Sequence, residues 1–157
     1  MGQTKILTET YTLANGVKIP KMGLGTWFIP DSEAAKTVCS AVKMGYRHMD
    51  TAQAYENERG VGEGIRSCGV ARESLFVTTK LAAEAKTYEE AAKAIDGSLE
   101  KMGLDYIDLM LIHSPQPWAD FRGGDYAEGN REAWRALEEA YKAGKLRAIG
   151  ISNFKEQ

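Results

Sequence analysis

The stretch that most constrains the fold is the apolar run over residues 106–112, which ends at His113 and is followed by Pro115 and Pro117. A strand with one face in water alternates apolar and polar residues, whereas a strand covered on both faces does not. The run therefore predicts a buried strand in a parallel sheet, and the prolines end its pairing. His113 then lies at the carboxyl end of that strand, where parallel α/β folds place their chemistry.

A repeating unit surrounds this strand. Helical patterns that end at a glycine alternate with short apolar strands that end in polar residues, which predicts βαβ units and a parallel sheet. Consecutive strands of such units lie side by side. The expected strands cover residues 22–27, 46–49, 75–79, 106–112 and 147–151. The helices between them are expected to be capped near Asp31 and Ser32, to span 58–67, to open with a capping box at 87–90, and to start near Asn130.

The same pattern distinguishes two α/β architectures. The first strand-to-helix turn, residues 23–28, lacks the third glycine of the dinucleotide-binding GxGxxG motif, so a doubly wound sheet is disfavoured. Polar residues at several successive strand ends favour a (β/α)8 TIM barrel, which needs about 250 residues. The 157 residues predict one domain, 1–157, with five parallel strands and four helices of such a barrel. An Asn15-Gly16 turn predicts a β-hairpin before them.

Composition excludes several partners. Lys and Arg total 20 against 22 Asp and Glu, so the chain has no basic footprint for nucleic acid. No apolar stretch approaches the roughly 20 residues of a membrane span. Cys39 and Cys68 lie far apart in sequence, which argues against a disulfide framework and a zinc site. We therefore expect no metal, no membrane and a cytoplasmic location.

Four polar side chains at the strand ends form a candidate catalytic set. Asp50, Lys80 and His113 end three strands, and Tyr55 follows Asp50 in a loop. A free tyrosine has a pKa of about 10, which a nearby ammonium lowers. Lys80 can supply that charge, Asp50 can orient Lys80, and His113 can donate to a substrate oxygen. This set suits carbonyl reduction with hydride from a nicotinamide.

Each member of the set also has an ordinary structural explanation. His113 could bond the backbone, Asp50 could cap a turn, Tyr55 could lie on the rim, and Lys80 could be a solvated charge. Each explanation is the commoner one for a residue taken alone. Four such residues on one face of a barrel make coincidence the weaker explanation.

Four motifs in the chain resemble those of the aldo-keto reductases, and together they extend over nearly the whole sequence. Residues 45–55 resemble the first signature of that family and residues 104–113 its second. Residues 76–81 resemble its lysine strand, and residues 150–154 the strand after the fourth helix. The resemblance implies a barrel plugged by a hairpin, which binds NADPH in an extended pose and reduces a small carbonyl substrate.

The resemblance also implies roles for individual residues. Tyr55 is the implied general acid, Lys80 and Asp50 tune it, and His113 orients the carbonyl. The residues implied to contact the nicotinamide end of the cofactor are Gly25, Thr26, Asp50, Ser152 and Asn153. Trp27 and Trp118 fall where the family lines its substrate pocket, although ordinary packing explains both equally well.

Departures from the family pattern leave the substrate unnamed. Glu56, Ala82 and Ser114 stand where many relatives have Gly, Trp and Trp. The loop that binds the cofactor phosphate in the family is expected beyond the length of this chain. An alternative function is therefore a catalytically silent fragment or a non-enzymatic scaffold of the same fold. A partial barrel of this kind is expected to associate with itself through its exposed strand edges.

Overall fold

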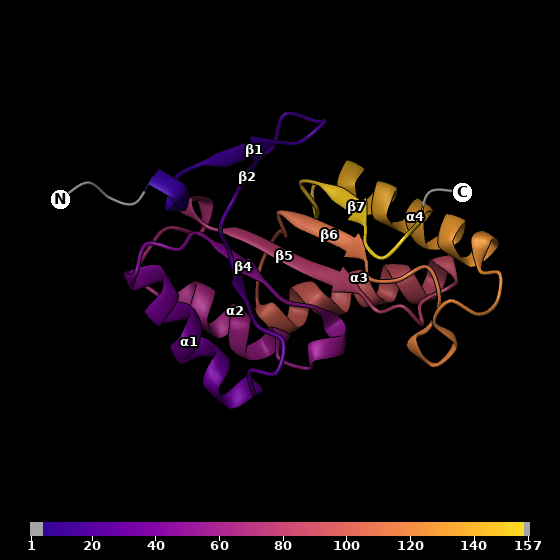
Figure 1. Cartoon of the computed structure of the whole chain (residues 1–157), viewed down its shortest axis with the longest axis horizontal. Coiled ribbons are helices and arrows are strands. Elements are labelled where there is room, and N and C mark those ends of the chain that lie inside the picture. Colours follow the sequence, from indigo (N-terminus) through magenta and orange to yellow (C-terminus); the bar gives the residue numbers. More distant parts are fainter. Residues whose placement is uncertain (1–4, 156–157) are drawn as a thin grey trace.

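The structure is a computed structural model that describes residues 5–155, so residues 1–4 and 156–157 of the predicted domain lie outside the described residues (Figure 1). The helices are α1 (Asp31–Lys43), α2 (Glu58–Ser67), α3 (Tyr88–Met102) and α4 (Ala127–Lys142). The strands are β1 (Thr10–Thr12), β2 (Lys18–Pro20), β3 (Leu24–Gly25), β4 (His48–Asp50), β5 (Phe76–Leu81), β6 (Leu109–Ile112) and β7 (Ile149–Ile151).

The five strands β3 to β7 form one parallel sheet in chain order. Every parallel connection passes through a helix, as the alternating pattern predicts. The register aligns the carboxyl ends of neighbouring strands, because Gly25 pairs with Asp50 and Lys80 pairs with Leu111. The predicted partial barrel, with five parallel strands and four helices, is confirmed.

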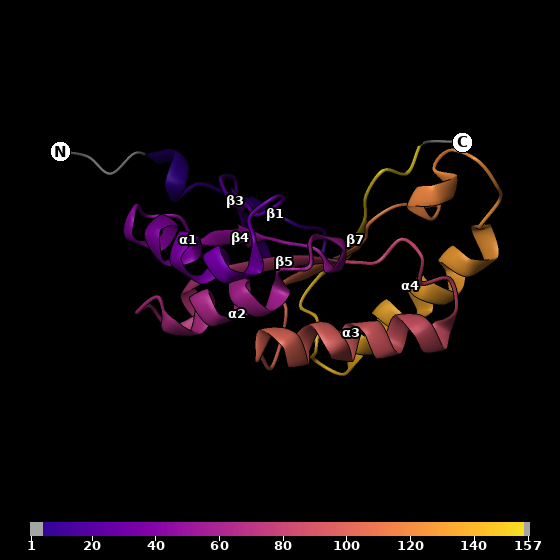
Figure 2. The same ribbon diagram turned by 90° about the horizontal axis from the view of Figure 1, so that it is seen from below.

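The helices cover the sheet in sequence order, with α1 against α2, α2 against α3 and α3 against α4. Figure 2 shows α2 and α3 below the sheet and α4 at its right-hand side. The core lies between helices and sheet, where Val38, Ile65, Ile95 and Leu137 are buried. No helix among residues 5–155 is both long and apolar enough to span a membrane.

The hairpin forms as the Asn-Gly signal predicts, with β1 antiparallel to β2. Gly16 has φ of +85°, a backbone conformation that glycine adopts at little cost. The Asn15 side chain makes a second contribution, because its Nδ2 donates to the Arg147 carbonyl at 2.9 Å. Since Arg147 lies just before β7, this bond ties the hairpin to the amino end of the sheet.

A buried ion cluster also secures the amino ends of the strands. Asp108 is fully buried just before β6. It accepts from Arg72 Nη2 at 2.6 Å, from Arg147 Nη1 at 2.7 Å and from the Val77 amide at 2.9 Å. A buried carboxylate needs such partners, because desolvating an unpaired charge is costly. Asp108 therefore fastens β5, β6 and β7 together at the end of the sheet away from the predicted site.

The starts of three helices differ from the sequence prediction in their capping or their position. Helix α1 has Pro30 at its N-cap without a side-chain cap, because the Asp31 carboxylate instead accepts from the Gly60 amide at 2.7 Å. At the start of α3, the Thr87 hydroxyl accepts a hydrogen bond from the Glu90 amide, as in a capping box. The Glu90 carboxylate accepts from the Lys86 backbone amide instead of the Thr87 amide, so the box is incomplete. Helix α4 starts three residues earlier than predicted, at Ala127.

The apolar run at residues 106–112 forms a shorter strand than expected, and its burial alternates. Met110 and Ile112 face the helices and are buried, whereas Leu109 and Leu111 on the opposite face are only partly buried. The prediction of a strand fully buried on both faces is therefore wrong for β6. It describes β5 instead, in which all six residues are buried.

Candidate active site

The four predicted catalytic side chains converge at the carboxyl end of the sheet. Lys80, 8% exposed, donates from Nζ to both Asp50 carboxylate oxygens, at 2.8 and 2.9 Å. It also donates to the Thr51 carbonyl at 2.9 Å and to the Tyr55 hydroxyl at 3.4 Å. The His113 ring meets the Tyr55 ring edge-on, with centroids 5.7 Å apart. A phenol, an ammonium, a carboxylate and an imidazole thus share one site.

The environment of His113 sets its protonation state. Burial, reinforced by the positive charge of Lys80, lowers the pKa of His113 below its ordinary value of 6.5. The ring is therefore neutral near pH 7. Its Nδ1 is buried without a hydrogen-bond partner among the described residues. A proton on Nδ1 would make it a buried donor without an acceptor, so we assign the proton to Nε2. That N–H is the group available to a substrate oxygen.

A short 3-10 turn, Gln53–Tyr55, follows β4 and places the Tyr55 hydroxyl beside Lys80 Nζ. The Tyr55 amide donates to the Ala52 carbonyl at 3.0 Å, and Glu56 then takes a left-handed conformation with φ of +57°. Glu56 is one of the departures from the family pattern, at a position where glycine would adopt this φ more easily.

Sequence reasoning missed Asn57, which is fully buried next to this turn. Its Oδ1 accepts from the Thr51 hydroxyl at 2.6 Å, and its Nδ2 donates to the carbonyls of Thr26 and Ile29. Asn57 therefore holds the tyrosine loop to the loop that follows β3. An asparagine directly before a helix is an N-cap signal that could have identified it, although it makes no side-chain cap here.

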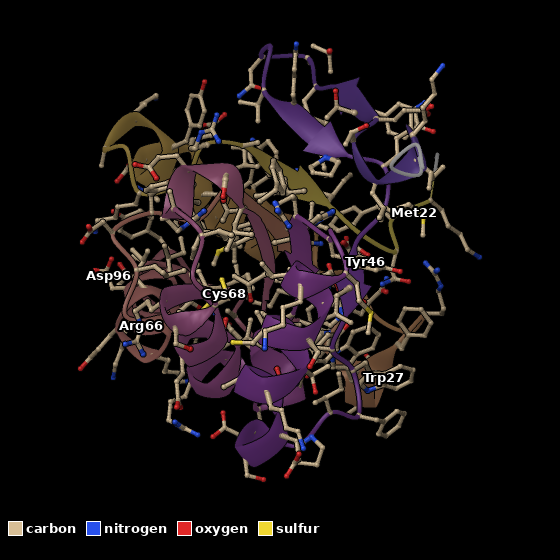
Figure 3. The ribbon with its side chains drawn as sticks, turned by 90° about the vertical axis from the view of Figure 1, so that its left-hand side faces the viewer. Met22, Trp27, Tyr46, Arg66, Cys68 and Asp96 are labelled. Atoms are coloured by element: carbon tan, nitrogen blue, oxygen red, sulfur yellow. The ribbon has the colours of Figure 1, made fainter. Side chains whose placement is uncertain are left out.

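A cavity of about 430 Å³ opens over the phenol and the imidazole, lined by Trp27, Ala54, Tyr55, His113 and Trp118. Trp118 packs edge-on against His113 at 4.9 Å between centroids. Trp27 is 65% exposed and stacks on the neighbouring Phe28 at 4.3 Å. It stands at the edge of the molecule in Figure 3. Both predicted pocket tryptophans thus line the cavity above the catalytic set.

The residues predicted to contact cofactor lie around the same rim. Gly25 ends β3, and a side chain there would meet nothing within 4 Å among the described residues, so space is open beside it. Thr26 is buried, and its hydroxyl donates to the Asp50 carbonyl at 2.9 Å. Asn153 Nδ2 donates to the His113 carbonyl at 2.8 Å and to Ser152 Oγ at 3.2 Å. Asn153 therefore connects the end of β7 to the strand that ends at His113.

Arg122 is a second residue that was not among the predicted site residues. It lies in the loop between β6 and α4, with φ of +66°, and its guanidinium stacks on Phe121. Its Nη1 donates to the Asn153 carbonyl at 2.8 Å. This hydrogen bond attaches the loop to the segment that follows β7. No periodic pattern marks such a loop contact, so the sequence offered no signal for it.

Comparison with known proteins agrees with this geometry. The sequence profile of the aldo/keto reductase family matches residues 21–156. Glyoxal reductase of Bacillus subtilis is 48% identical over 149 residues, which cover 94% of this chain and 50% of that protein. Morphine 6-dehydrogenase of Pseudomonas putida is 45% identical over 145 residues, which cover 92% of this chain and 46% of that protein. The chain thus spans about half the length of the curated relatives that it matches.

Solved structures give the same result. An aldo/keto reductase from Brucella melitensis superposes with a TM-score of 0.84 at 44% identity, covering 94% of this chain and 53% of that one. A Bombyx mori aldo-keto reductase in complex with NADP superposes with a TM-score of 0.80 at 38% identity, covering 93% and 50% of the two chains. The motifs, the sheet and the profile match together show that this chain belongs to the aldo/keto reductase family.

Proposed function

We propose that the protein carrying this segment reduces aldehydes or ketones to alcohols with hydride from NADPH, and that Tyr55 donates the proton. One observation carries the proposal. The Lys80 ammonium lies 3.4 Å from the Tyr55 hydroxyl and is held in place by Asp50 and the Thr51 carbonyl. A buried lysine that contacts a phenol at the mouth of a cavity is an arrangement for releasing a phenolic proton.

The residues divide the work of one reduction. A hydride adds to the carbonyl carbon while the Tyr55 hydroxyl gives its proton to the carbonyl oxygen, so the product is an alcohol and the tyrosine is left as a phenolate. The Lys80 ammonium stabilises the negative charge that develops on the phenol oxygen. His113, neutral with its proton on Nε2, can donate to the same carbonyl oxygen and orient it within the cavity.

The rim residues fit the nicotinamide end of the cofactor. NADPH supplies the hydride when bound, and the NADP in the Bombyx mori reductase supports this assignment. A carboxamide needs one donor and one acceptor. The Ser152 hydroxyl can donate, because its oxygen already accepts from Asn153 Nδ2, and Asn153 Oδ1 can accept. The open space beside Gly25 and the Asp50 side chain border the position proposed for the ribose.

The cavity favours a small carbonyl compound with an apolar body. Two tryptophans wall it, while the phenol and imidazole supply its reactive polar atoms. This arrangement orients one carbonyl group and leaves the remainder of the substrate against aromatic surface.

The test is an assay of NADPH oxidation against a panel of small aldehydes and ketones. Tyr55→Phe should lower kcat by about 10²-fold or more, because a positioned general acid contributes about that much. Cofactor binding, followed by tryptophan fluorescence, should stay unchanged. Tyr141→Phe on the exposed face of α4 is the matched control and should turn over normally. Retained turnover in Tyr55→Phe would remove this residue from the role of acid.

A second candidate is a non-catalytic scaffold or a silent fragment. The observation that favours it is the pair of edge strands, since β3 and β7 each have a single sheet neighbour among residues 5–155. The same assay separates the candidates. A protein that carries the intact site but oxidises no NADPH with any carbonyl would support the scaffold.

A further inference from the structure

Behind the Tyr55–Lys80 contact, on the helix side of the sheet, lies a closed group of hydrogen bonds that the proposed reaction does not use. Its members flank the two reacting residues in sequence. Gln53 and Glu58 lie on either side of Tyr55, and Thr79 and Ala82 lie on either side of Lys80. We call this group, completed by Ser98 of α3, the rear network.

Two bonds of the rear network join the tyrosine loop directly to the lysine strand. Gln53 Oε1 accepts from the Ala82 amide at 2.7 Å, and Glu58 Oε1 accepts from the Thr79 hydroxyl at 2.6 Å. The segment that carries Tyr55 is therefore attached at one end to β5 and at the other end to Ala82, which directly follows β5. These two attachments lie on either side of Lys80 in the sequence.

Ser98 closes the group from α3. Gln53 Nε2 donates to Ser98 Oγ at 2.8 Å, and Ser98 Oγ donates to Glu58 Oε1 at 2.9 Å. Gln53 Nε2 also donates to the Ala94 carbonyl at 2.9 Å. A hydroxyl has one proton to give and can accept as well, so this order of donors satisfies Ser98 fully. One helix thus locks both ends of the tyrosine segment.

Stability alone explains the rear network poorly. Glu58, Ser98 and Thr79 are at most 2% exposed, and Glu58 Oε2 is buried without a hydrogen-bond partner among the described residues. Burying a carboxyl group with one unpaired oxygen is costly, and an apolar side chain of similar volume would avoid that cost. The hydrogen bonds instead restrict the relative positions of the groups that they join, which is a contribution that buried polar networks can make.

We propose that Gln53, Ser98 and Glu58 are positioning residues that set the distance between the Tyr55 hydroxyl and Lys80 Nζ. Lys80 has three other partners at 2.8 to 2.9 Å, so its own position is already determined. The contact with Tyr55 is the longest of the four, at 3.4 Å. Its length therefore depends on where the tyrosine segment is held. This inference rests on the proposed function, in which that contact prepares Tyr55 to give its proton.

The kinetic test uses the protein that carries this segment and compares two substitutions of Glu58. Glu58→Leu removes the acceptor for Thr79 and Ser98 and should lower kcat by about 10- to 100-fold, the loss that a misplacement near 1 Å produces. KM for the carbonyl and the NADPH affinity should change by less than about twofold, because neither ligand contacts the network. Glu58→Gln keeps Oε1 as acceptor and should restore most of kcat.

A matched control separates positioning from general destabilisation. Ile95 lies on the same helix as Ser98, is 1% exposed and contributes no polar atom to the network. Ile95→Val should lower the melting temperature while leaving kcat per folded molecule unchanged. If Ile95→Val lost as much kcat as Glu58→Leu, or if Glu58→Leu lost none, the proposed positioning role would be wrong.

A second readout does not depend on turnover. Lys80 Nζ lies 4.9 Å from the centroid of the Tyr55 ring. Nuclear Overhauser contacts between the Tyr55 ring and the Lys80 side chain should therefore be present in the unchanged protein and in Ile95→Val, and should weaken in Glu58→Leu and Gln53→Ala. If the unchanged protein reduces no carbonyl, the proposed function fails while these contacts still decide the positioning role. Contacts of equal strength in all four proteins would overturn it.

Discussion

The two histidines of the chain, His48 and His113, are both partly removed from water, which disfavours their protonated form. Burial lowers the pKa of His48 below 6.5, although Asp50 partly opposes the shift. Its Nε2 lies 2.8 Å from the Thr78 hydroxyl, and its ring meets Phe76 edge-on. Burial and the nearby Lys80 charge lower the pKa of His113 as well. Folding therefore favours the neutral form of both rings.

This preference for the neutral form predicts acid sensitivity. The unfolded chain takes up protons at its histidines near pH 6.5, before the folded chain does, so the stabilisation is complete above that value and is lost as the pH falls toward the lower folded pKa values. The free energy of unfolding, measured with urea, should fall between about pH 7.5 and pH 5.5, a range above the titration of ordinary carboxylates. His48→Gln should reduce that loss. An equal loss in His48→Gln would show that His48 contributes nothing to it.

At the scale of elements, helix α2 packs closely because three of its residues are glycines. A side chain at Gly60 would lie 2.1 Å from the Asp31 carbonyl of α1, and one at Gly62 would lie 2.2 Å from the Met102 carbonyl of α3. Gly64 lies against Val38 of α1 in the same way. Alternate glycines thus let α2 fit between its two neighbours.

Two glycine substitutions with the same chemistry should have opposite effects. Gly62→Ala should destabilise the protein by about 1–3 kcal/mol, because the new methyl group overlaps backbone that cannot move away easily. Gly97 lies within α3, and a side chain there meets nothing within 4 Å among the described residues. Gly97→Ala should therefore stabilise by about 0.5–1 kcal/mol through helix propensity. Thermal unfolding of both variants checks this, and a gain in stability for Gly62→Ala would refute the packing argument.

Some elements of the structure form because of signals within a single segment of the sequence. Hydrophobic period and glycine stops predicted all four helices, because both signals arise within one segment. Hydrophobic period predicts that Ala92, Ile95, Leu99 and Met102 form the buried face of α3, and this prediction is only partly correct. Ala91 and Ser98 are buried there, whereas Ala92 and Leu99 are half-buried. Ser98 is buried because Gln53 and Glu58 bond it from another element, and sequence periodicity carries no information about such partners.

In the candidate site, too, some features were predictable from the sequence and others were not. The strand ends and the family motifs predicted that Asp50, Tyr55, Lys80 and His113 would lie together. The structure brings all four into one site. Their catalytic roles remain predictions. The contacts of Asn57 and Arg122 join loops that are distant in sequence, so only the folded chain reveals them.

At the scale of the whole molecule, the sheet has two edges among the described residues. Strand β3 lies at one edge and β7 at the other, and Ile151 at the end of β7 is 52% exposed. Unpaired strand edges with apolar side chains favour pairing with another chain. Figure 1 shows β7 beside α4 at the carboxyl end of the chain.

The isolated 157-residue segment should therefore self-associate. Light scattering coupled to size exclusion should give a mass above that of one 17.3 kDa chain, rising with concentration. Ile151→Lys, which places a charge on the edge strand, should shift the population toward monomer. A monodisperse monomer at every concentration, with little binding of a dye specific for apolar surface, would argue against association through the edges.

The same segment should bind NADPH only weakly. The residues assigned to the cofactor contact its nicotinamide end, and a partial set of contacts gives little surplus over the entropy lost on binding. Titration with NADPH should thus leave the fluorescence of its three tryptophans nearly unchanged. Strong quenching at micromolar NADPH would show that residues within this segment also bind the remainder of the cofactor.

The Asp108 cluster has a practical consequence for altering this protein. Asp108, Arg72 and Arg147 hold the sheet at its amino end, whereas every group assigned to the reaction lies at the carboxyl end. We therefore expect substitutions at the amino end to affect stability and substitutions at the carboxyl end to affect the proposed reaction. Engineers can reshape the aromatic cavity while the ionic anchor is left intact, and can reinforce the anchor without entering the cavity.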